Sequence, residues 1–429
     1  MKLPYGEVEF DRDGAFVTPE QIEQARKLIG DERATDVLVI SHGWNNTHGD
    51  ARALYDRLID SIVAVRSGVE GATRRRFVIL GMLWPSIQWA APESDGAGAS
   101  VGGSAAALEA ELARQVPDPG LRGKLLALVP ELETSSAARS DFVTLLRTEL
   151  PEGATDNDDP DSAPQALRDA DAESVLQAAA GTDNDDNAPA AVGGAAASID
   201  PAGLPALDET GGGAGISIGD ILDGARNVLN ATTYYTMKDR AGVVGRKGIS
   251  KLLDELHSKN GQVRLHLVGH SFGGRAITAA ALVTSAPVSS MSLLQAAYSH
   301  YGMAQGWDGA DKNGEFWKVP KKVGGPVIIT FTRNDKAVGL AYPVASRIAR
   351  QIGAGLGDAD DKYGGIGRNG ALKTPAALAP VPLQSVGGHY AFQQGKVSSL
   401  NADAFVKSHG GVTGKEVAYA VLSAVMAAS

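Results

Sequence analysis

The sequence predicts an α/β fold: a mainly parallel central sheet with helices on both faces, interrupted by a large insert. Two observations predict this fold. Short, continuous apolar runs alternate with segments of helical spacing, both before residue 87 and after residue 230. Such runs are typical of strands buried on both faces, as in a parallel sheet. Residues 87–230 differ in composition, so we assign residues 1–86 and 231–429 to one α/β domain.

The first part of the chain contains one strand–helix–strand unit. Asp36–Ile40 and Arg76–Trp84 are apolar runs that predict two buried strands. Between them, Ala51–Val65 has leucine, isoleucine and valine at helical spacing and predicts a helix. Another helix is predicted at Thr18–Leu28, which begins with a threonine cap and a proline. This order of elements predicts a parallel βαβ unit.

The same alternation returns after residue 230. Three apolar runs predict strands, and four amphipathic or alanine-rich segments predict helices. The predicted strands are Val263–Val268, Met291–Ala297 and Pro326–Thr332, and the predicted helices are Gly248–His257, Gly274–Val283, Ala337–Gln351 and Lys415–Ala428. Repeated alternation of this kind predicts helices that cover both faces of one sheet.

Residues 87–230 are interpreted as an insert with helical and low-complexity parts. Three segments predict short helices with apolar faces: Ala105–Ala113, Leu121–Leu132 and Asp141–Leu150. Ala91–Ala107 and Pro151–Gly215 are rich in small residues, and the second is also acidic and contains the pentapeptide Thr-Asp-Asn-Asp-Asp twice. Such segments bury too little apolar surface to offset the entropy of ordering, so we expect both to be flexible.

The composition excludes several classes of protein. The chain has 429 residues and no cysteine, which excludes disulfides and a cysteine nucleophile. Its formal net charge of −10 disfavours general binding to nucleic acid or to anionic membranes. The sequence has no uninterrupted apolar stretch of about 18 residues, the length that predicts a membrane span. Its N-terminus lacks the pattern of an export signal. We therefore expect a cytoplasmic protein, with export by a route that needs no signal peptide left open.

The strongest motif is Gly269-His270-Ser271-Phe272-Gly273, which matches the nucleophile pattern Gly-x-Ser-x-Gly. A predicted strand precedes it and a predicted helix follows it, so the turn between them must be sharp. Such a turn strains the backbone at Ser271 and tolerates only small neighbours, which explains Gly269 and Gly273. The helix also directs its positive amino end at the serine. The motif predicts Ser271 as a nucleophile; the alternative is a glycine turn with an incidental serine.

A second motif, Ser41-His42-Gly43-Trp44, follows the first predicted strand. Acyl transfer needs two backbone N–H groups directed at the developing oxyanion. Phe272, directly after the predicted nucleophile, would supply one N–H, and Trp44, after the flexible His42-Gly43 pair, would supply the other. The alternative is a turn glycine with a packed histidine and tryptophan.

The chain resembles the α/β-hydrolase superfamily in three features. They are the strand followed by His42-Gly43, the turn at Ser271 and the later strand that ends near an acid. The resemblance covers residues 1–86 and 231–429, and the insert lies outside it. It implies a catalytic triad in the chain order serine, acid, histidine.

The resemblance implies Asp335 as the acid and His409 as the base. Asp335 lies just beyond the predicted strand Pro326–Thr332, where an open α/β sheet builds its site. His409 precedes the final helix, as the catalytic histidine does in this superfamily. Asp335 would orient the imidazole, and the alternative role for it is a helix cap. The rival residues left open are Asp308, Asp311 and Asp403 for the acid and His389 for the base.

These residues predict a serine hydrolase of the carboxylesterase or lipase type, acting on a small-molecule or lipid ester without a metal or organic cofactor. A serine peptidase or thioesterase, or a non-catalytic binding module on the same fold, is the alternative. A lipid-attacking effector is disfavoured because the insert lacks a basic amphipathic helix. The insert precedes the nucleophile strand, whereas lids more usually follow the next strand, where residues 298–325 form a shorter excursion.

Overall fold

The computed structural model of the chain describes residues 3–86, 105–153, 162–180, 218–335 and 364–428. The predicted helix Ala337–Gln351 and both copies of the acidic pentapeptide lie outside these ranges.

The described residues form one eight-stranded sheet in the order β1-β3-β2-β4-β5-β6-β8-β7, in which every neighbouring pair of strands is parallel. The α/β fold and the parallel sheet predicted from the sequence are therefore confirmed. The strands are β1 (Tyr5–Glu9), β2 (Asp36–Ser41), β3 (Phe77–Leu83), β4 (Arg264–His270), β5 (Val288–Leu294), β6 (Val327–Phe331), β7 (Val381–Pro382) and β8 (Val397–Asn401).

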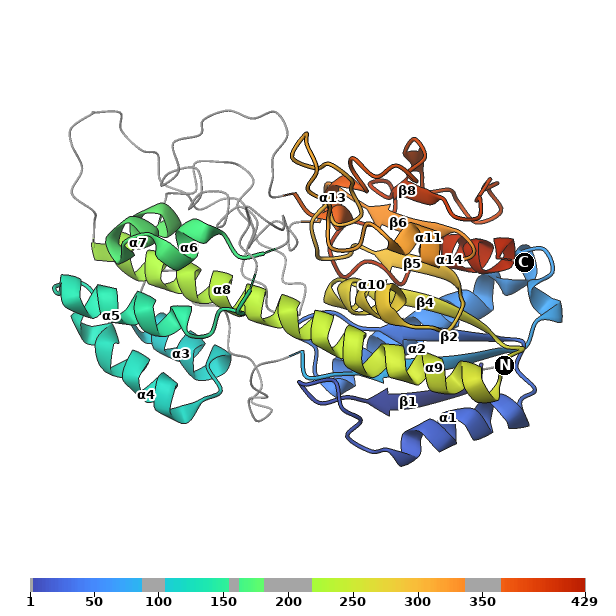
Figure 1. The fold of residues 1–429 in the computed structure, drawn as a ribbon, viewed down its shortest axis with the longest axis horizontal. Helices are drawn as coiled ribbons and strands as arrows, with labels where there is room; N and C mark the ends of the chain where they lie inside the picture. Colours follow the sequence, from blue (N-terminus) through green and yellow to red (C-terminus); the bar gives the residue numbers. More distant parts are fainter. Residues whose placement is uncertain (1–2, 87–104, 154–161, 181–217, 336–363, 429) are drawn as a thin grey trace.

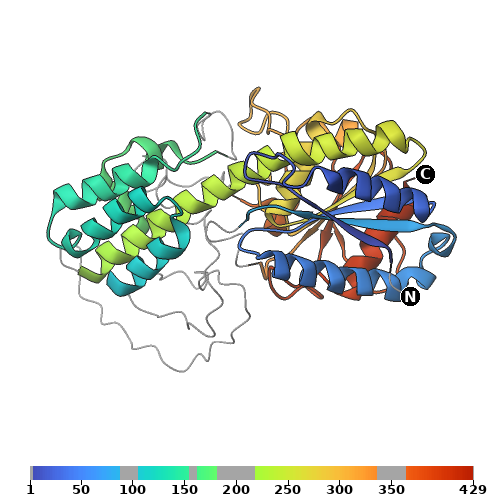
Figure 2. The same cartoon turned by 90° about the horizontal axis from the view of Figure 1, so that it is seen from below.

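Helices cover both faces of this sheet (Figures 1 and 2). Within β2, Val37 and Val39 belong to one apolar core, whereas Leu38 and Ile40 belong to the other. The first core is shared with α1 (Glu20–Asp31), α9 (Ser250–Lys259) and α10 (Phe272–Val283), and the second with α2 (His48–Val65) and α14 (Lys415–Ala427). Burial on both faces explains why these strands read as continuous apolar runs.

Three strands were not predicted from the sequence. The strand β1 lies at one edge of the sheet and has the mixed sequence Tyr-Gly-Glu-Val-Glu, and β7 has two exposed residues at the other edge. The strand β8 has the sequence Val-Ser-Ser-Leu-Asn, so small polar residues interrupt its apolar pattern. The predicted threonine cap of the first helix is wrong: α1 has Pro19 at its N-cap position and no side-chain cap.

The insert contains a helical lobe, which consists of α3 to α7 and the first half of α8 (Figure 1). Its helices are α3 (Ala105–Gln115), α4 (Pro119–Leu128), α5 (Ser136–Arg147), α6 (Gln165–Asp169), α7 (Ala172–Ala180) and α8 (Ile218–Val243). The three helices predicted in this region are present. The expectation of a flexible chain from Pro151 onward is wrong for α6 and α7, because Leu167, Val175 and Leu176 are buried in the core of the lobe.

The long helix α8 connects the lobe to the sheet (Figures 1 and 2). It has 26 residues and runs without interruption through Asn230, where the sequence suggested the end of the insert. A π-helical turn, Val244–Ile249, joins it to α9. Two glycines allow close packing: a Cβ at Gly224 would lie 2.5 Å from the Leu176 carbonyl oxygen of α7, and one at Gly245 would lie 2.1 Å from the Ala276 carbonyl oxygen of α10. The helix α8 is thus packed closely against α7, and the π-helical turn that follows it is packed closely against α10.

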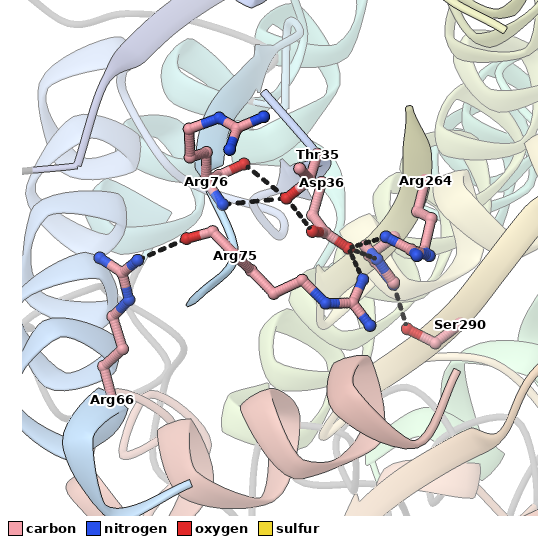
Figure 3. Close-up of polar contacts among 8 residues, drawn as sticks. Thr35, Asp36, Arg66, Arg75, Arg76, Arg264 and Ser290 are labelled. Atoms are coloured by element: carbon pink, nitrogen blue, oxygen red, sulfur yellow. Dashed lines mark hydrogen bonds and ion pairs between the residues drawn. The ribbon is translucent and has the colours of Figure 1, made fainter. Parts of the chain in front are cut away.

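A buried polar cluster lies near the amino ends of the central strands (Figure 3). Asp36 Oδ1 is 2.9 Å from Arg75 Nη1 and 3.1 Å from His266 Nε2, and His266 Nδ1 is 2.8 Å from Ser290 Oγ. Burial alone would raise the pKa of Asp36, but hydrogen bonds from His266 and Thr35 lower it overall. The cluster has the residue types of a catalytic triad, yet Asp36, His266 and Ser290 are almost completely inaccessible to solvent. It therefore ties strands together.

Candidate active site

Ser271 occupies a strained turn between β4 and α10. Its backbone has φ 56° and ψ −126°, a region that residues other than glycine rarely adopt. A Cβ at Gly269 would lie 2.5 Å from the Gly273 carbonyl oxygen, and one at Gly273 would lie 2.2 Å from the Ser41 carbonyl oxygen. Both glycines of the motif are therefore required by the close approach of backbone to backbone, as the sequence predicts.

The loop after β2 lies directly against this turn. A Cβ at Gly43 would lie 2.5 Å from the Cβ of Ser271. Among the described residues, no hydrogen-bond acceptor is bound to the N–H of Trp44 or to that of Phe272. The structure thus brings the loop to the serine, as expected, and leaves the two predicted donors available.

His42 holds the loop in place as a neutral imidazole. The N–H of Trp84 donates to His42 Nε2 at 3.3 Å, so the proton resides on Nδ1, which donates to the Gly43 carbonyl oxygen at 2.9 Å. The two rings also stack, with centroids 5.2 Å apart. Burial lowers the pKa of His42 to about 4. His42 therefore acts through the backbone of Gly43.

His409 and Asp335 form a hydrogen-bonded pair across a wide separation in sequence. His409 Nδ1 lies 2.8 Å from Asp335 Oδ2, and the Asp335 side chain is completely buried. Asp335 follows β6 and His409 follows β8, so both lie beyond the carboxyl ends of strands. A carboxylate oxygen accepts this hydrogen bond, so Nδ1 carries a proton and Nε2 is the nitrogen directed away from Asp335.

The rival residues do not form such a pair. His389 is exposed, as are Asp308 and Asp311. Asp403 accepts hydrogen bonds from Thr332 Oγ1 and from the N–H of Arg333, each at 2.8 Å, and thereby supports the loop that carries Asp335. Of the candidate acids and bases that the structure describes, Asp335 and His409 are the two that are hydrogen-bonded to each other.

His270 connects the hydrogen-bonded pair of His409 and Asp335 to the turn that carries Ser271, a role that the sequence did not indicate. Its Nε2 lies 2.9 Å from the His409 carbonyl oxygen and must donate, because a carbonyl only accepts. The two imidazole rings have centroids 4.7 Å apart. His409 is thus held beside the residue that precedes Ser271. Among the described residues none is hydrogen-bonded to the Ser271 hydroxyl, so the proposed transfer of its proton requires His409 and Ser271 to come closer when substrate binds.

The electrostatics of this region favour neutral side chains at two positions. Burial, followed by the nearby His409, lowers the pKa of His270 to about 3. Together with His42, this gives two buried imidazoles that stay uncharged at neutral pH. Among the described residues there is no group of three or more histidine, aspartate or glutamate side chains placed to hold a metal ion.

We expect these two histidines to make the fold sensitive to acid. At pH values below their ordinary pKa of 6.5, His42 and His270 bind protons in the unfolded chain but remain uncharged in the folded protein. The free energy of unfolding should therefore fall between pH 6.5 and 4, by up to about 1.4 kcal/mol per pH unit for each histidine. Urea denaturation at several pH values measures this slope. His270→Gln should reduce it, whereas exposed His389→Gln should not; an unchanged slope in the first variant would contradict the assignment.

Comparison of the chain with protein-family models, with curated proteins and with solved structures finds no match. None of the helices that the structure describes is long and apolar enough to cross a membrane.

Proposed function

We propose that this protein is a serine hydrolase of the α/β-hydrolase type that acts on an ester, in the manner of a carboxylesterase or lipase. The observation that carries the proposal is the hydrogen bond between His409 and buried Asp335, held next to the strained turn of Ser271 by the contact between His270 and His409. A base oriented by an acid, beside a serine on a sharp turn, is the arrangement that activates a hydroxyl nucleophile.

In the proposed mechanism, Ser271 Oγ attacks the ester carbonyl carbon and His409 Nε2 takes the hydroxyl proton. Asp335 holds the imidazole with its proton on Nδ1 and stabilises the imidazolium that forms. The N–H groups of Phe272 and Trp44 donate to the oxyanion. His409 then gives its proton to the leaving alcohol, and a water activated by the same imidazole hydrolyses the acyl-enzyme and regenerates Ser271.

The strain at Ser271 favours catalysis over an incidental serine in a turn. A non-glycine residue in a sparsely populated backbone region costs about 1–3 kcal/mol. Glycine would relieve this cost at no loss to a purely structural turn. A serine hydroxyl presented by such a turn is useful when the hydroxyl reacts, which supports an enzyme rather than a non-catalytic binding module.

Hydrolysis of a p-nitrophenyl ester series tests the proposed function. The wild-type protein should release a burst of p-nitrophenolate equal to the enzyme concentration if deacylation is slower than acylation. Ser271→Ala should lower kcat about 10⁶-fold, to the level of the background. Ser258→Ala, an exposed serine on α9, serves as the control and should keep full activity. Equal turnover by Ser271→Ala and wild type would overturn the proposal.

A further inference from the structure

Three aromatic rings meet beside the turn that holds Ser271. The ring of Tyr234 lies 5.0 Å from that of Phe272 and 6.2 Å from that of Trp44, and the Trp44 and Phe272 rings are 6.0 Å apart, all between centroids. Such spacings are typical of attractive aromatic packing. Phe272 and Tyr234 are 1% and 4% exposed, so their packing is close to that of a protein interior.

The three rings come from three separate segments of the chain. Trp44 lies in the loop after β2, Phe272 is the first residue of α10, and Tyr234 lies on α8, the helix that continues into the helical lobe. On either side of Tyr234 along the chain, Gly224 of α8 packs closely against α7, and Gly245 of the π-helical turn that follows α8 packs closely against α10. The carboxyl ends of the strands point toward the helical lobe (Figure 1).

The two residues that Tyr234 contacts are the two whose backbone N–H groups would hold the oxyanion. Both donors must point to one oxygen atom at about 2.7–3.1 Å. A displacement of about 1 Å in such a site can lower the rate about 10²-fold. Trp44 is in a loop, and among the described residues the rings of Tyr234 and Phe272 pack against its ring.

The geometry points to Tyr234 as a positioning residue: its ring, carried on the second half of α8, sets the spacing of the Trp44 and Phe272 N–H groups. This inference rests on the proposed function. It predicts that loss of the ring weakens stabilisation of the transition state more than binding of the ground state.

Two substitutions test the role of the ring. Tyr234→Leu, which removes the ring and keeps apolar volume, should lower kcat for a p-nitrophenyl ester about 30-fold with little change in KM. It should also raise the inhibition constant of a trifluoromethyl ketone, whose adduct with serine carries an oxyanion, by the same factor. Tyr234→Phe should restore wild-type values. Tyr390→Leu, on a ring that packs with Phe392 and Tyr419 away from this cluster, is the matched control.

The outcomes separate this inference from the proposed function. Wild-type kcat in Tyr234→Leu, or a loss of kcat without weaker inhibition by the ketone, would overturn the positioning role while Ser271-dependent turnover remained. A Tyr234→Phe variant as impaired as Tyr234→Leu would overturn it too, because the ring would not be the operative feature. If turnover does not depend on Ser271 in any variant, the proposed function itself fails. Thermal unfolding of each variant verifies that the fold is retained.

Discussion

His409→Ala is expected to lower kcat for ester hydrolysis about 10⁶-fold, as much as loss of the nucleophile itself. In the proposed mechanism His409 is the base, and its Nδ1 lies 2.8 Å from the buried carboxylate of Asp335. Without it no group accepts the serine proton, so the hydroxyl remains a weak nucleophile. Steady-state kinetics with a p-nitrophenyl ester measures the loss, and circular dichroism verifies that the variant is folded.

His389→Ala is the matched control for this substitution. His389 also lies in a glycine-rich loop of the C-terminal part, but it is exposed. Its removal should leave kcat and KM within about twofold of wild type, since most surface substitutions are close to neutral. If His389→Ala abolished turnover and His409→Ala did not, the assignment of the base would be wrong.

Asp335→Asn is expected to lower kcat about 10⁴-fold while leaving the fold intact. The asparagine amide can donate a hydrogen bond to His409 Nδ1, which favours the tautomer with the proton on Nε2. That tautomer cannot accept the proton of Ser271. The loss should therefore appear in kcat far more than in KM.

Asp403→Asn distinguishes the acid from its neighbour. Asp403 binds Thr332 and the backbone of Arg333 through one oxygen, and asparagine retains an acceptor there. We expect a loss of activity below about tenfold, because the substitution disturbs only hydrogen bonds of about 1 kcal/mol each. A larger loss in Asp403→Asn than in Asp335→Asn would reverse the two roles.

The central strands could be predicted from the sequence because burial on both faces removes polar residues from them. Val37 and Leu38 face opposite cores, so β2 reads as one apolar run. The strand β8 could not be predicted, because Ser398 and Ser399 interrupt its pattern although both are buried. The helix α7 could not be predicted, because the sequence around it is acidic and rich in alanine and its few larger apolar residues give no clear helical pattern.

The candidate site was predictable in part for similar reasons. Ser271 and the two glycines beside it could be predicted because they form a local sequence pattern, and one sharp turn requires all three residues. The pairing of His409 with Asp335 could be predicted only from the order of catalytic residues in the family that the sequence resembles. The contacts of His270 with His409 and of Tyr234 with Phe272 join segments far apart in sequence, and no local pattern indicates them.

Labelling with a fluorophosphonate tests most directly whether Ser271 is an activated nucleophile. Trypsin digestion yields the peptide Leu265–Arg275, in which Ser271 is the sole hydroxyl-bearing residue, so mass spectrometry can locate the label. The account predicts one phosphonyl group per chain on this peptide and none on Ser271→Ala. A label of equal extent on Ser271→Ala, or one located on a different peptide of the wild-type chain, would contradict it.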